Sequence, residues 1–273
     1  MNTFETLTMP GRRLGLRPSD PNRPVLELSR ILAAAPPPHP LAADHLTQVT
    51  DWGLYENDQY GDCGPAAVAN SRKLVTRILA GAEESPTQAE VFDLYRASGN
   101  PDFDPDTGAG DNGVEMATML AAVRNAGLGG VRSLAEAKVD VTDLDEVRAA
   151  IAIFGFLLLG CDLEIAQHAQ TDSGLWDYQP SQEWGGHAVL AGAYTSAPSG
   201  ADVEVVTWAE VVGTTDVFWR RQVTEGWVCI WPEAVGTTQF QQGIDVAALN
   251  ADYQALTGRP GPFPVGAAGM RVS

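Results

Sequence analysis

The chain has 273 residues, enough for one large or two small domains, and its hydrophobic content of 44% permits a sizeable core. Its formal net charge of −18 at pH 7 argues against a nucleic-acid-binding surface. No run of residues approaches the roughly 18 apolar residues of a membrane span. We therefore expect neither nucleic acid nor a membrane among its partners.

The charge is unevenly distributed along the chain. Residues 1–30 hold five arginines against three acidic side chains, which leaves 12 basic and 32 acidic side chains for the remainder. A mildly basic arm on an acidic body could contact an acidic neighbour, including another copy of the chain. The plainer interpretation is a solvated tail on a solubilising surface.

Three cysteines, Cys63, Cys161 and Cys229, are too few and too uneven in number to suggest a disulfide framework. Cys161 and Cys229 lie in apolar runs, as small core residues do. The N-terminal residues lack the apolar core of a signal peptide. These features predict synthesis and folding in a reducing cytoplasm.

Three regions are predicted. Residues 1–45 are rich in proline, with a short helical pattern at 25–35, and form an extended N-terminal arm that either packs over the body or reaches a partner. Residues 46–257 form the folded domain. Residues 258–273, rich in Gly and Pro, form an irregular C-terminal tail.

Helical patterns dominate the first half of the domain and strand patterns the second. Helices are expected from Cys63 to Gly81, from a capping box at Ser85 to about Ser98, and over 113–126, 142–152 and 245–257. Strands are expected over 154–159, 187–194, 203–208 and 226–231, with a helical turn at 216–221. Helices followed by strands predict an α+β fold with two subdomains around a cleft.

Cys63 and His187 form the most informative pair of residues. Cys63 begins a predicted helix, where the helix dipole and free backbone N–H groups favour a thiolate. His187 heads a strand that would hold a general base rigidly. Asn57 or Gln59, together with the Cys63 N–H, could stabilise an oxyanion. The plainer alternatives are a small residue at a helix start and a satisfied core histidine.

The motifs around this pair resemble those of the papain-like cysteine peptidase superfamily. The matching segments are Asp51-Trp52-Gly53, the run Asn57–Gly64, Gly186-His187-Ala188-Val189, Val206-Thr207-Trp208 and Gly226-Trp227. Cys63 and His187 are 124 positions apart, near the roughly 130–150 typical of papain-type enzymes. Over residues 8–257 the chain is similar to an uncharacterised papain-like group encoded by actinobacterial phages and prophages.

The resemblance implies a papain-like two-subdomain α+β fold, with a helical left half and a curled antiparallel sheet as its right half. It implies a peptidase or amidase in which Cys63 is the nucleophile, His187 shuttles the proton and Asn57 binds the oxyanion. The expected substrate is a peptide, a protein or the peptide stem of peptidoglycan. No cofactor is implied.

One position departs from the papain pattern. The asparagine that orients the histidine in papain falls on Val206, and strand alternation predicts that Thr207 points to the other face. Glu204, Glu210 or Asp216 could approach His187 instead. The departure supports an alternative function: a catalytically degenerate papain fold serving as a structural capsid or tail component. Such a protein would be made in the host cytoplasm and could enter the virion, contacting other virion proteins through its arm.

Substrate-binding residues are also predicted. The loop Asp111-Asn112-Gly113 echoes the glycine-rich site loop of the superfamily, although helix capping would equally explain it. Trp184 and Trp208 are assigned to substrate binding, and Trp176 and Tyr178 could complete an aromatic rim. The residues around 102–113 lack the glycine and glutamate of a calcium loop, and the His and Cys spacing fits no metal site, so no metal is expected.

Overall fold

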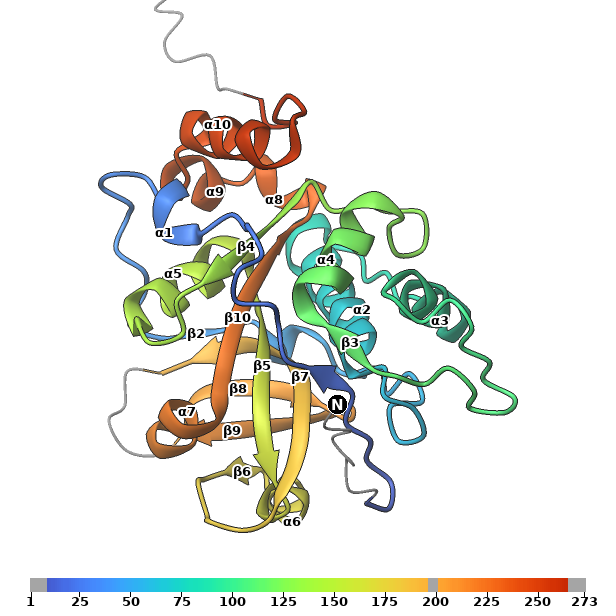
Figure 1. Ribbon diagram of the computed structural model, residues 1–273. Coiled ribbons are helices and arrows are strands. Elements are labelled where there is room, and N and C mark those ends of the chain that lie inside the picture. The colour runs from blue at the N-terminus through green and yellow to red at the C-terminus, as the bar shows by residue number, and fades with distance from the viewer. Residues whose placement is uncertain (1–8, 196–200, 265–273) are drawn as a thin grey trace, which may run out of the picture.

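The computed structural model describes residues 9–195 and 201–264 (Figure 1). Within these ranges ten strands form one mainly antiparallel sheet, whose main path is β4-β10-β5-β7-β8-β9-β6. The longer strands are β5 (Leu157–Glu164), β7 (Glu183–Tyr194), β8 (Ala201–Thr207), β9 (Glu210–Thr215) and β10 (Val223–Ile230). The shorter strands are β1 (Leu16–Arg17), β2 (Ala43–Asp44), β3 (Val114–Glu115), β4 (Ala135–Val139) and β6 (Leu175–Trp176).

The helices fall into groups around this sheet (Figure 1). One group stands beside β7 and β10 and comprises α2 (Cys63–Val75), its π-helical continuation (Thr76–Ala80), α3 (Gln88–Ala97) and α4 (Met116–Asn125). Others cover the sheet or its ends: α1 (Leu28–Ile31), a 3₁₀ turn (Leu46–Gln48), α5 (Leu144–Phe154), α6 (Ala166–Ser173) and α7 (Asp216–Gln222). The C-terminal helices are α8 (Pro232–Val235), α9 (Thr238–Gly243) and α10 (Val246–Thr257).

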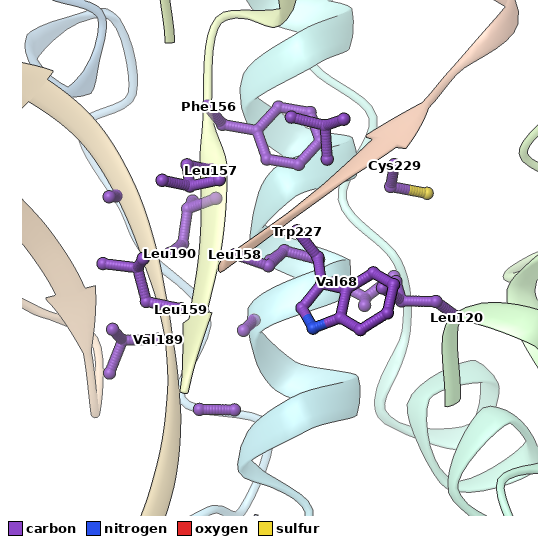
Figure 2. Close-up of a cluster of buried hydrophobic side chains, with 14 of the residues drawn as sticks. Val68, Leu120, Phe156, Leu157, Leu158, Leu159, Val189, Leu190, Trp227 and Cys229 are labelled. Carbon is purple, nitrogen blue, oxygen red and sulfur yellow. The ribbon is translucent and has the colours of Figure 1, made fainter. Parts of the chain in front are cut away.

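The predicted α+β fold is confirmed: a helical half, centred on α2, packs against an antiparallel sheet. Every residue of α2 is buried. Ala66, Ala67 and Ala69 present little side-chain volume, which lets the helix backbone approach its neighbours closely. Figure 2 shows the core that results, with Val68 of α2 beside Trp227 of β10.

Several predicted boundaries are wrong, for local reasons. The strand expected from residue 154 begins at Leu157, because α5 runs on to Phe154 and ends at Gly155 with a φ of 85°. The helix expected from residue 113 begins at Met116, because residues 114–115 pair with β1. The capping box is formed by Thr87 and Glu90 rather than by Ser85.

The described part of the N-terminal arm packs over the body. Leu26, Leu28 and Ile31 are buried, β2 pairs with β7, and β1 pairs with both β3 and β7. Residues 1–8 of the predicted arm and residues 265–273 of the predicted tail lie outside the described residues. Across the described ranges, none of the helices combines the length and apolar character that a bilayer crossing requires.

The capping box of α3 gives a direct test of the local structure. Thr87→Ala removes the hydroxyl that accepts the Glu90 N–H, and we expect a loss of about 1 kcal/mol in the free energy of unfolding. Ser85→Ala removes an exposed hydroxyl from the position that the sequence pattern favoured and is the matched control. Urea unfolding of both variants is the measurement. An equal loss in the two would contradict the observed cap.

Candidate active site

Cys63 and His187 lie at one junction between α2 and β7. Cys63 is the first residue of α2, and its Sγ accepts a hydrogen bond from the backbone N–H of Ala188 at 3.4 Å. Ala188 follows His187 on β7, and both Cys63 and His187 are 1% exposed. The two residues singled out from the sequence therefore meet across the boundary between the helical half and the sheet.

The imidazole of His187 is fixed from two directions. Its Nε2 lies 2.7 Å from the hydroxyl of Thr207, and the indole of Trp208 stacks on the ring with centroids 4.1 Å apart and planes 12° apart. Trp184 stacks in turn on Trp208 at 5.6 Å. Within the described part of the chain, Nδ1 of His187 has no hydrogen-bond partner. The ring is thus held through Nε2 and through its face, and not through Nδ1.

Thr207 corrects the sequence-based assignment of the orienting residue. Alternation does place Thr207 and Val206 on opposite faces of β8, but His187 lies on the Thr207 side. Trp208 and Ala209 then turn the chain into β9 with φ of 45° and 63°. Aligning the asparagine of papain with Val206 therefore overlooks the hydroxyl of Thr207, the next residue in the chain. That hydroxyl, rather than the carboxylate of Glu204, Glu210 or Asp216, bonds Nε2.

Asn57 is buried and directs its amide toward backbone carbonyls. Its Nδ2 donates to the carbonyl of Tyr60 at 3.0 Å and to that of Arg13 at 3.3 Å, and it lies 3.4 Å from Oδ1 of Asp62. Trp208 Nε1 donates to the same Arg13 carbonyl at 3.3 Å. Gln59, the other candidate, is exposed. The side-chain N–H groups of Asn57 and Trp208 thus both donate to one peptide carbonyl, that of Arg13.

The Arg13 carbonyl belongs to the N-terminal arm, which runs through the site. The Gly15 N–H donates to the carbonyl of Gly186 at 3.3 Å and also faces the Cys63 sulfur. The Gly15 carbonyl accepts from Val114 N–H at 2.7 Å. The arm is therefore a strand laid between the 113–115 segment and β7. The sequence predicts an arm that either packs over the body or reaches a partner, but it carries no sign that this arm lies over Cys63.

The predicted loop Asp111-Asn112-Gly113 lies along the same strand of the arm. Asp111 accepts from the Gly61 N–H at 2.9 Å and from the Tyr95 hydroxyl at 2.6 Å, so its carboxylate braces the loop before Cys63. Gly113 has a φ of 72°, and a Cβ there would overlap the Gly15 carbonyl. Asn112 bonds within its own loop, to the Gly110 carbonyl at 3.0 Å. The loop thus borders the arm mainly through its backbone.

The two tryptophans of the predicted aromatic rim are not at the surface, whereas Tyr178 is half-buried. Trp176 is fully buried, and Trp184 is 2% exposed behind Trp208. The two tryptophans support the stack on His187 instead of presenting a face to a ligand, because the polar segment that carries them folds back onto the sheet. The predicted substrate-binding role of Trp184 does not fit this position, whereas Trp208 contacts the arm directly.

Burial decides the charge state of the pair. Burial raises the pKa of the Cys63 thiol to about 12 and lowers the pKa of His187 to about 3. The neighbouring Asp62 is also buried, which raises the pKa of its carboxyl well above the usual range. Near neutral pH the covered site therefore holds a thiol and a neutral imidazole. A thiolate requires that water reach the sulfur.

In residues 9–195 and 201–264, no group of three or more His, Cys, Asp or Glu side chains is placed to hold a metal ion.

Comparison with known proteins places the fold. No protein-family model matches the chain, and no curated protein matches its sequence. Among solved structures, it is similar to xylellain, a cysteine protease from Xylella fastidiosa, with a TM-score of 0.56 and 13% identity over 81% of this chain and 97% of that one. Digestive procathepsin L 3 of Tenebrio molitor gives 0.54 and 11% identity over 81% and 76% of the two chains.

A plant enzyme agrees with these two. The Carica candamarcensis cysteine protease CMS1MS2 gives a TM-score of 0.52 and 14% identity over 70% of this chain and 99% of that one. All of these neighbours are cysteine proteases of the papain type, which supports the resemblance seen in the sequence. At these identities the likeness concerns the fold. The chain therefore has the papain-like fold, with Cys63 and His187 at the junction of its two halves.

The buried imidazole predicts a specific acid sensitivity. An unfolded chain protonates this histidine below about pH 6.5, whereas the folded chain resists protonation down to about pH 3. The stabilisation from the neutral ring is present above pH 6.5 and is lost as the pH falls, by up to about 1.4 kcal/mol per pH unit. Urea midpoints between pH 7 and 4 should fall more steeply for the wild type than for His187→Gln. His39→Gln, at the periphery, should keep the steep profile, and parallel profiles for all three would contradict the assignment.

Proposed function

We propose that the chain is a papain-like cysteine peptidase or amidase encoded by a phage or prophage. Cys63 attacks an amide carbonyl and His187 carries the proton. One observation supports this most strongly: an oriented histidine and a helix-terminal cysteine lie together beneath a bound peptide strand. The phage origin rests on the sequence resemblance.

The proposed reaction uses the free nitrogen of His187. Nδ1 takes the thiol proton, and the Cys63 sulfur forms a bond to the carbonyl carbon. The resulting oxyanion is held by the Cys63 N–H and by Nδ2 of Asn57. Nδ1 then gives the proton to the leaving amine as the C–N bond breaks, and water hydrolyses the thioester. Asn57 already donates to the Arg13 carbonyl, which supports its role as a donor to a peptide oxygen.

Thr207 is proposed as the positioning residue for His187. In this mechanism Nδ1 accepts the thiol proton, so Nε2 carries the ring hydrogen and donates it to the Thr207 hydroxyl, which holds that tautomer and ring orientation without contributing a charge. The alternative function, an inactive scaffold in a virion, is supported by Val206 in the orienting position and by the long irregular tails. The Thr207 hydroxyl at 2.7 Å from Nε2 speaks against the first of these two arguments. The proposed substrate remains a protein or the peptide stem of peptidoglycan, met in the host cytoplasm or from a particle.

The reactivity of Cys63 tests the proposed pair. Wild-type Cys63 should be alkylated slowly by iodoacetamide at pH 6–8, because its thiol is covered and its pKa is about 12. Gly15→Val should speed the reaction at least about tenfold, because a side chain at this position overlaps the Gly61 carbonyl and displaces the arm. His187→Gln in the Gly15→Val background should reverse that gain at neutral pH. Peptide mapping by mass spectrometry identifies the labelled cysteine.

The control for this experiment is Gly236→Ala, at an exposed glycine where a Cβ meets no atom within 4 Å. It should label as slowly as the wild type. The same variants are then incubated with a peptide library, and new N-termini are counted. Cleavage by Gly15→Val that is absent from Gly15→Val/Cys63→Ala supports a peptidase. Labelling that is fast but indifferent to His187 would contradict the mechanism.

The positioning role of Thr207 has its own test. In the Gly15→Val background, Thr207→Val should shift the pH profile of Cys63 alkylation toward that of an ordinary thiol, near pH 8.5. Thr207→Ser keeps the hydroxyl and should restore the profile of the parent. Val206→Thr places a hydroxyl on the opposite face and should change nothing. Identical pH profiles for Thr207→Val and Thr207→Ser would rule out the positioning role, even if both variants lose some stability.

A further inference from the structure

A cavity of about 340 Å³ lies between β8, β9, α7 and the turn that leads from β4 into α5 (Figure 1). Its volume is in the range of small-molecule sites in proteins. It is separate from the Cys63 site, because Asp202 of the cavity and Thr207 beside His187 are five positions apart on β8, which is about 17 Å along an extended strand. The peptidase chemistry proposed above does not use this cavity.

The wall of the cavity is largely apolar. Its apolar lining consists of Val141, Leu144, Val203, Trp219 and Val223. The indole of Trp219 is fixed in place, because its Nε1 donates to the Val141 carbonyl at 2.8 Å. A fixed aromatic ring among aliphatic side chains binds an apolar group by removing it from water. The wall therefore suits the uncharged body of a ligand.

A β-bulge brings a carboxyl group to this apolar wall. In the pairing of β8 with β9, Ala201 lies opposite Thr215 and Val203 opposite Thr214, so Asp202 is an extra residue on β8. Strict alternation would place Asp202 and Val203 on opposite faces of the strand, yet both line the cavity. The bulge thus re-aims the strand at the one position that carries a charge.

Only one of the two oxygens of Asp202 has a partner. Its Oδ2 accepts from the Arg148 guanidinium at 3.0 Å, whereas no described residue bonds its Oδ1. The side chain is only 10% exposed, and burial raises its pKa although Arg148 opposes the rise. A buried oxygen without a donor is costly. A ligand N–H that reaches Oδ1 therefore gains more than the same bond would give at the surface.

A second carboxylate favours a cation at this end of the cavity. Asp216, the first residue of α7, lines the cavity and is close enough to raise the pKa of Asp202. Arg220 also lines the cavity, but its side chain is 69% exposed and lies 3.9 Å from Asp216. An exposed pair of this kind is weak and well solvated. The buried polar end of the cavity is therefore acidic.

We propose that this cavity binds a small organic cation, whose ammonium group donates to Oδ1 of Asp202 and whose aromatic or branched apolar body lies against Trp219. The bond between the ammonium group and the carboxylate is charge-assisted, and the apolar wall holds the body. The proposal does not rest on the peptidase function, because none of its residues belongs to the Cys63 site.

The test titrates phenethylamine into the isotope-labelled full chain near neutral pH, where the amine is charged, and follows the indole N–H signals by NMR. The loss of one signal in Trp219→Phe identifies Trp219, and Trp208→Phe identifies Trp208 in the same way. The Trp219 signal should shift and saturate, whereas that of Trp208, stacked on His187, should stay in place. An unmoved Trp219 signal would overturn the proposal.

Two further probes separate the parts of the ligand on the wild-type protein. Phenethyl alcohol keeps the aromatic body and a donor but has no charge, and methylammonium keeps the charge but has no body. Each should bind at least about tenfold more weakly than phenethylamine, because one loses the charge-assisted bond and the other the apolar contact. Equal affinity for phenethylamine and either of these probes would contradict the proposal.

Asp202→Asn removes the charge but keeps the size of the side chain and an acceptor oxygen. It should weaken phenethylamine binding at least about tenfold. Asp252→Asn is the matched control, because Asp252 also pairs with an arginine, Arg30, but does not line the cavity. It should bind as the wild type does.

Circular dichroism checks that both variants are folded. Unchanged affinity in a folded Asp202→Asn protein would overturn the assignment of Asp202, and an equal loss in both variants would do the same. If Asp202→Asn does not fold, the comparison of the three probes on the wild type decides the question.

Discussion

The contact between the start of α2 and β7 is the constraint on which the site depends. The Cys63 sulfur lies against the Ala188 N–H, so the helix N-terminus and the histidine strand meet without intervening side chains. Beside this contact, a Cβ on Gly186 would overlap the Leu16 carbonyl and one on Gly61 would crowd the Leu14 carbonyl, so the two glycines make room for the backbone of the arm. The same closeness leaves a slot that admits one peptide backbone and excludes bulk water.

Exclusion of water explains why Cys63 and His187 are uncharged in the covered site. A cysteine at a helix N-terminus favours a thiolate when it is hydrated, but burial outweighs the helix dipole here and keeps both Cys63 and His187 neutral. The arm is part of that cover, and its Leu14 and Leu16 pack in the hydrophobic core. Its bonds are mainly to backbone, with a charged anchor at Arg12. One segment therefore covers the sulfur through backbone bonds and a single charged anchor.

The contacts around His187 show that a threonine can hold the histidine ring, as an asparagine does in papain. Thr207 supplies a neutral hydroxyl to Nε2, and Trp208 covers the ring. Behind them, Trp184 is buried and gives the stack a rigid support. A hydroxyl fixes the ring without a charge, which suits a site that is dry when covered, because a buried carboxylate would carry a large desolvation cost there.

Local signals in the sequence determined the elements whose causes are local: the helix led by Cys63 with its stop at Gly81, the buried strands, and the choice of Cys63 and His187 as candidates. What the sequence could not determine depended on partners distant in the chain. Thr207 was passed over because strand alternation says which residues share a face but not where a histidine 20 positions away will lie. The arm was recognised as basic and proline-rich, yet its place over the sulfur depends on backbone bonds to Val114 and Gly186, which carry no side-chain signature. Only tertiary packing places these two backbone edges at the distance that holds one strand between them.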